Sequence, residues 1–170
     1  MAINFICDTE KYTFNDVSKT ISLPIKSFEL PKEFLIENNL LSLKLSFHVT
    51  LVPIGRIVLK HKIDIPNIYE LVLKDFCEFT NNNDINFETF SNDFKFCVEE
   101  DKKSIVVMCK VSNLDKFFEM INKKYELNIE CPPAHVTLYT IEFKKGIFLI
   151  DQEDIKNLTT SIDNPIGRSL

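Results

Sequence analysis

The chain has 170 residues, of which 45% are hydrophobic and 26% are charged, and its net charge is −5 at pH 7. This length and this composition are typical of one globular domain over residues 1–170. The negative charge argues against binding of long duplex nucleic acid, which needs a basic face, and favours a small nucleotide or a short single strand. Only three glycines are present, and no glycine-rich phosphate loop is found.

The five cysteines are an odd number without a C-x-x-C pair, which argues against a disulfide framework and against a zinc site. Cys77, Cys97 and Cys109 lie in apolar patterns and are expected to be small core residues. The chain has neither a leader-like start nor an apolar run of about 18 residues. We therefore expect a protein of the reducing cytoplasm without membrane contact.

In chain order, the first expected elements are a strand over Ile21–Leu30 and a short helix over Pro31–Glu37. A strand over Leu41–Val52 follows, ended by Pro53 and Gly55, because apolar and polar residues alternate there with a period of two. The face expected in the core carries Leu41, Leu43, Leu45, Phe47, Val49 and Leu51.

Helical spacing of apolar residues predicts helices over Ile68–Phe79 and Leu114–Tyr125, the second capped by Ser112 or Asn113. Between them, strands over Phe94–Val98 and Ser104–Val111 flank a polar turn and predict a hairpin.

After Pro132-Pro133, we expect a strand over Ala134–Phe143 and a short strand over Gly146–Ile150. Asp151 is the expected N-cap of a helix that runs to about Ser161. This order of elements predicts an α+β fold with hairpins rather than regular βαβ alternation.

The tetrapeptide His-Val-Thr-Leu occurs twice, beginning at His48 and at His135, although the chain has only three histidines. In a strand, residues two apart point to the same side. His48 therefore shares a face with Thr50, and His135 shares one with Thr137. Each copy lies in its own half of the chain, which suggests two similar lobes that each present one strand to a shared cleft.

Two imidazoles around one site can divide the work of acid–base catalysis, one as the base and the other as the acid. Two threonine hydroxyls can donate hydrogen bonds to the non-bridging oxygens of a phosphate. This set of side chains suits cleavage of a phosphodiester without a metal ion or another cofactor.

The paired H-x-T-x motifs resemble those of the two-histidine phosphoesterase superfamily, which includes RNA 2′,3′-cyclic phosphodiesterases, ligase-like enzymes and phosphodiesterases that destroy oligonucleotide defence signals. The resemblance covers both motifs and the domain organisation. It implies a bilobal, pseudo-twofold-symmetric fold with antiparallel sheets flanking a central cleft, and it implies catalytic roles for His48, Thr50, His135 and Thr137. The implied substrate is a 2′,3′-cyclic phosphate or a small cyclic or 2′-5′ oligonucleotide.

Three further residues are candidates for substrate binding. Tyr139 shares a face with His135 and Thr137 in a regular strand and can stack on a base. Lys44 precedes His48 on the same face, and Arg56 follows the first motif strand, so either cation can bind a phosphate. His61, between two lysines and without a threonine two residues on, is expected at the surface.

Other interpretations of the two motifs stay open at the level of sequence. The histidines can be buried residues bonded to their threonines, or metal ligands, although neither His-Val-Thr-Leu tetrapeptide carries a carboxylate. The protein can also be a nucleotide-binding protein that sequesters or senses its ligand without cleaving it, or a structural domain. The sequence does not determine the oligomeric state.

Overall fold

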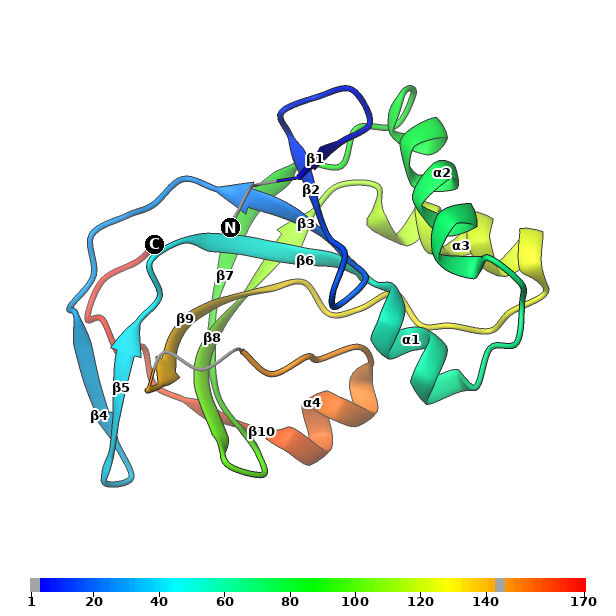
Figure 1. Ribbon diagram of the computed structural model, residues 1–170. Coiled ribbons are helices and arrows are strands. Elements are labelled where there is room, and N and C mark those ends of the chain that lie inside the picture. Colours follow the sequence, from blue (N-terminus) through cyan, green and yellow to red (C-terminus); the bar gives the residue numbers. More distant parts are fainter. Residues whose placement is uncertain (1–3, 143–145) are drawn as a thin grey trace.

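The structure is a computed structural model that describes residues 4–142 and 146–170 (Figure 1). Its helices are α1 (Ile54–His61), α2 (Ile68–Thr80), α3 (Leu114–Tyr125) and α4 (Gln152–Leu158). Its strands are β1 (Phe5–Ile6), β2 (Tyr12–Asn15), β3 (Thr20–Ile25), β4 (Glu33–Ile36), β5 (Asn39–Leu43), β6 (Phe47–Pro53), β7 (Phe87–Glu99), β8 (Lys102–Val111), β9 (His135–Ile141) and β10 (Thr159–Ile162).

The described strands form one antiparallel sheet, which confirms the predicted α+β class. Its main path is β1-β2-β3-β6-β9-β8-β7-β10, and the β4–β5 hairpin joins through pairing of β5 with β9. The two motif strands, β6 and β9, are therefore neighbours within this sheet. No helix among the described residues is long and apolar enough to span a membrane.

Hydrophobic side chains fill both faces of the sheet. The larger core includes Val49 of β6, Val107 of β8 and Val136 of β9, and it is covered by apolar residues of α1, α2 and α3. A smaller core contains Val106, which lies next to Val107 in β8 and so points to the other face. Its other members are Cys97, Ile147 and Leu149, packed against residues of α4.

The predicted strand over Leu41–Val52 is two strands, β5 and β6, separated by a bend at residues 44–46. Phe47, Val49 and Leu51 are buried as expected, but Leu45 is 91% exposed. The bend interrupts the alternation that placed Leu45 in the core. It also lets β5 pair with the far end of β9, while β6 pairs with β3 and with the start of β9.

Several other elements are confirmed. Helices α2 and α3 agree with their apolar spacing, and β7 and β8 form the expected hairpin. The side chain of Asp151 caps α4 by accepting a hydrogen bond from the backbone N–H of Asp154 at 2.9 Å. Asn113 occupies the N-cap position of α3, as predicted, but it lies at a φ of 59° and its side chain makes no capping bond.

Three predicted elements are wrong. Residues Pro31–Glu37 contain strand β4, which turns back into β5 at Glu37 and Asn38, both with positive φ. The strand predicted over Gly146–Ile150 is an extended segment without strand pairing, and the chain enters β10 after Leu158 instead of continuing the helix to Ser161. The strand predicted over Ile21–Leu30 ends at Ile25. Phe143, the predicted end of the strand that carries the second motif, lies outside the described residues.

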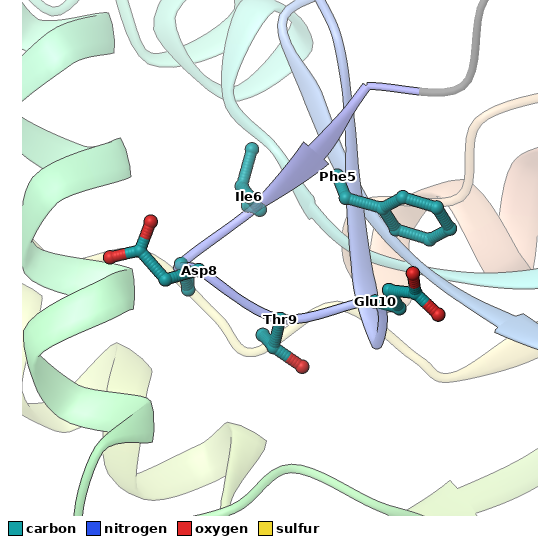
Figure 2. Close-up of a pocket in the computed structure, with 6 residues that line it drawn as sticks. Phe5, Ile6, Asp8, Thr9 and Glu10 are labelled. Atoms are coloured by element: carbon teal, nitrogen blue, oxygen red, sulfur yellow. The ribbon is translucent and has the colours of Figure 1, made fainter.

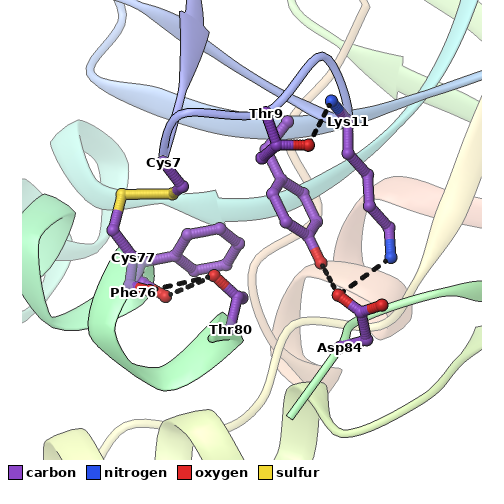
Figure 3. Close-up of a disulfide and its surroundings, with 8 residues drawn as sticks. Cys7, Thr9, Lys11, Phe76, Cys77, Thr80 and Asp84 are labelled. Atoms are coloured by element: carbon purple, nitrogen blue, oxygen red, sulfur yellow. Dashed lines mark hydrogen bonds and ion pairs between the residues drawn. A yellow bond between two sulfur atoms is a disulfide. The ribbon is translucent and has the colours of Figure 1, made fainter. Parts of the chain in front are cut away.

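A disulfide joins Cys7, just after β1, to Cys77 of α2, with a Cα–Cα distance of 4.8 Å (Figure 3). This bond corrects the expectation that Cys77 is a free core thiol, while Cys97 and Cys109 are free and buried as expected. Disulfides persist mainly in oxidising environments. The cytoplasmic location of the protein therefore stays a prediction.

Candidate functional site

The two His-Val-Thr-Leu motifs lie side by side in the sheet. β6 and β9 are antiparallel, and Val49 is opposite Val136. This is the one residue pair that joins the two strands in the described part of the chain. Because each valine is the second residue of its motif, a regular antiparallel ladder continued by one residue would set His48 opposite Thr137 and Thr50 opposite His135. The two motifs therefore run antiparallel, with their valines paired.

All four polar motif residues lie on one face of this strand pair. Val49 and Val136 are both 0% exposed and point into the larger core. Since successive strand residues alternate, the histidines and threonines flanking them point to the other face. Directly opposite residues have Cβ atoms about 5 Å apart and diagonal ones about 7–8 Å. We call His48, Thr50, His135 and Thr137 the quartet.

His135 is the more enclosed imidazole, with 7% of the residue exposed. Its Nδ1 lies 2.8 Å from the carbonyl oxygen of Pro133. A carbonyl oxygen only accepts, so Nδ1 carries the proton and donates it, which leaves Nε2 of the neutral ring as an acceptor. Burial lowers the pKa of His135, and the Pro133 carbonyl acts in the opposite direction.

His48 combines solvent access with a crowded surrounding. The residue is exposed, yet desolvation, followed by repulsion from Lys44 and His135, lowers its pKa to about 4. Lys44 and His135 both lower the pKa of His48, so these three potentially cationic groups lie near one another.

Lys44 lies in the bend between β5 and β6 and is half-buried. Burial lowers the pKa of its ammonium group. None of the ion pairs found between described residues includes Lys44. A partly desolvated cation without a carboxylate beside it favours binding of an anion, and Lys44 is therefore retained as a candidate for binding phosphate.

Arg56, in the first turn of α1, stacks its guanidinium on the ring of Phe148, 5.1 Å from the ring centroid. Phe148 belongs to the extended segment Gly146–Ile150, which we call the strap. Arg56 makes no ion pair or hydrogen bond with the described part of the chain. Its N–H donors are free for an external acceptor, but no contact places Arg56 against the quartet.

The predicted role of Tyr139 at the cleft is wrong. Tyr139 is 0% exposed, belongs to the larger core, and donates a hydrogen bond from its hydroxyl to the carbonyl oxygen of Pro31 at 2.9 Å. The pairing of β8 with β9 explains this position, because Thr137 faces Val106 while Tyr139 faces Ile105. The extra residue, Leu138, is a bulge that breaks the alternation on which the prediction depended.

Two neighbours of the second motif were missed. The Pro133 carbonyl fixes the tautomer of His135, and the strap lies against Thr137 at Gly146. The dipeptide Pro132-Pro133 before the motif indicates a rigid approach to β9, but the direction of its carbonyl is not encoded in any residue pattern. Gly146 carries no local feature that marks a contact with Thr137.

Within residues 4–142 and 146–170, no three His, Cys, Asp or Glu side chains group in a way that could hold a metal ion. His61 is exposed at the end of α1, as expected. A cavity of about 380 Å³ lies at the loop Phe5–Glu10 (Figure 2), and a second, of about 20 Å³, lies among apolar residues of α1, α2 and α3. Neither cavity is lined by a residue of the quartet.

Comparison with protein-family models, with curated proteins and with solved structures found no match for this chain.

Proposed function

We propose that the protein is a metal-independent phosphodiesterase that hydrolyses a nucleotide phosphodiester by two-histidine acid–base catalysis. One observation carries this proposal: the antiparallel pairing at Val49 and Val136 brings both histidines and both threonines to one face of adjacent strands. A diagonal Cβ separation of about 7–8 Å lets one phosphate lie between the two imidazoles. The proposal includes the bilobal two-histidine phosphoesterase fold implied by the sequence motifs.

The environment of His135 suits the general base. With its Nδ1 proton held by Pro133, its Nε2 is ready to take a proton from the attacking water. The attacking oxygen then forms a bond to phosphorus as the bond to the leaving oxygen breaks. A lowered pKa keeps His135 neutral at pH 7, as a base must be.

His48 is then the general acid that protonates the leaving oxygen. In the free protein it is neutral at pH 7, because its pKa is about 4. A bound phosphate anion offsets the repulsion from Lys44 and raises the pKa of His48. Substrate binding therefore leads to protonation of His48, which can then act as the acid. The hydroxyls of Thr50 and Thr137 donate to the non-bridging oxygens and orient the phosphate.

The proposed substrate class rests on charge and on the sequence motifs. The net charge of −5 argues against a long polymer. Lys44 beside His48 supplies one cation for an anionic group. A 2′,3′-cyclic phosphate or a small cyclic or 2′-5′ oligonucleotide fits these conditions.

The test is turnover in the presence of EDTA, with a panel of 2′,3′-cyclic mononucleotides, ADP-ribose cyclic phosphate, 2′,5′-oligoadenylate, and cyclic di- and trinucleotides. We expect cleavage of at least one of these, lost in both His48→Ala and His135→Ala and kept in His61→Ala. Turnover that needs a divalent ion, or that survives either replacement within a few-fold, contradicts the proposal. A ligand that raises the melting temperature but is recovered intact would identify a sequestering protein instead.

A further inference from the structure

The strap crosses the quartet side of β9 and meets the second motif at Gly146. A Cβ atom built on Gly146 would lie 3.0 Å from Oγ1 and 3.4 Å from Cγ2 of Thr137. A contact of 3.0 Å is shorter than ordinary van der Waals contact between such atoms, so any side chain here presses on the Thr137 hydroxyl.

Backbone conformation does not account for a glycine at this position. Among the described glycines, only Gly167 has a positive φ. An L-residue can therefore adopt the conformation of Gly146, and the short distance to Thr137 is the feature that requires a glycine.

The strap is held in place and has little freedom to retreat from β9. Ile147 and Leu149 are 3% and 2% exposed and pack in the smaller core. Beyond them, the backbone N–H of Ile150 donates to Asp154 at 2.9 Å. Asp154 also pairs with Lys60 of α1 at 3.0 Å. A displacement caused by a side chain at position 146 is therefore transmitted to Thr137.

We propose that Gly146 is a positioning residue, whose missing side chain lets the strap rest against Thr137 and holds that hydroxyl in its place in the quartet. The consequence for turnover rests on the function proposed above. The consequence for the geometry of Thr137 does not. The first motif has no equivalent, because no glycine contacts Thr50 in the part of the chain that the structure describes.

NMR of the threonine methyl groups in Gly146→Ala tests whether Gly146 sets the position of Thr137. This test does not require the protein to be an active enzyme. We expect the Thr137 methyl resonance to shift and the Thr50 resonance to stay, since the two threonines have equal positions in their motifs. The control is Ile147→Val, which loosens the strap without adding an atom next to Thr137. An unmoved Thr137 resonance, or equal shifts of both threonines, overturns the inference.

The kinetic part uses a double-mutant cycle. A displacement of a few tenths of an ångström should lower kcat of Gly146→Ala by roughly fivefold or more, given about 100-fold for a displacement of 1 Å. In a Thr137→Ala background, Gly146→Ala should change kcat by less than about twofold, because the group it displaces is gone. Equal losses in both backgrounds overturn a role through Thr137. If the wild-type protein shows no turnover that depends on His48 and His135, the proposed function is contradicted instead.

Discussion

The two copies of His-Val-Thr-Leu have the same sequence but different surroundings. His48 is exposed and has Lys44 beside it. His135 is enclosed, and a backbone carbonyl holds its Nδ1 proton. The difference comes from residues outside the tetrapeptides: a bend before the first copy and two prolines before the second. Identical motifs can thus be assigned unequal tasks, an acid at the open site and a base at the enclosed one.

Removal of either imidazole should have the largest effect and should also show how the two sites differ. On the best substrate, we expect His48→Ala and His135→Ala each to lower kcat by about 10² to 10⁴. They should differ in stability, because His135→Ala also leaves a cavity and the Pro133 carbonyl without its donor. A cost of roughly 2 kcal/mol lowers Tm by about 4–8 °C in a chain of this size.

His48→Ala should leave Tm within about 2 °C of the wild type, because surface replacements change stability little. Calorimetry and initial rates on the same preparations give both quantities, with His61→Ala as the matched control. Equal losses of Tm in the two variants would show that the motifs do not differ in enclosure.

The threonines give the next largest effect. Thr50→Val and Thr137→Val remove a hydroxyl and add a methyl group, so packing is nearly kept. We expect kcat to fall by about 10- to 100-fold in each, since the loss of one donor to a developing anion costs up to 10²–10³. Steady-state rates with unchanged Tm would support this expectation, and a change confined to one threonine would contradict a symmetric hold on the phosphate.

Lys44→Met should sharpen the contrast between the histidines without abolishing turnover. It removes a charge that depresses the pKa of His48, so that pKa should rise from about 4. Lys44 is not among the causes that shift the pKa of His135, which should stay where it is. Imidazole titration by NMR measures both, and Lys123→Met, at an exposed position of α3, is the control. A parallel rise of both pKa values would contradict the assignment.

The smallest expected effect is the dependence of stability on pH. Both histidines have folded-state pKa values below the usual 6.5. The unfolded chain therefore binds more protons below pH 6.5, and the free energy of unfolding falls as the pH drops from about 6.5 towards 4. Urea denaturation at pH 7 and pH 5 should show a smaller difference for His48→Asn than for the wild type. An unchanged difference would argue against a lowered pKa in His48.

Local patterns predicted the elements that carry the site. The alternation of Val and Leu with polar residues identified β6 and β9, because the apolar motif residues Val49, Leu51, Val136 and Leu138 are buried in the core. Helical spacing identified α2 and α3 for the same reason. The four quartet residues were identified from the repeated tetrapeptide. The register that joins them, Val49 opposite Val136, was not predicted, because pairing between distant strands is a tertiary property.

The errors have equally specific causes. The strand ends at Pro53 as predicted, but the helix that follows it, α1, was missed. Its buried residues are Ile54 and Ile57. The bulge at Leu138 depends on the partner strand β8, so Tyr139 could not be placed from the sequence of β9. The disulfide joins cysteines 70 residues apart, and pairing over that distance has no local signature.

The most direct test of the shared site is a titration of the three histidines by NMR with a nucleoside 2′- or 3′-monophosphate, the product of opening a cyclic phosphate. If His48 and His135 face one phosphate, their imidazole resonances should shift together with a single Kd, and the pKa of His48 should rise. His61, exposed at the end of α1, should not respond. Unmoved resonances of His48 and His135, or equal shifts of all three histidines, would contradict a shared phosphate site between the two motif strands.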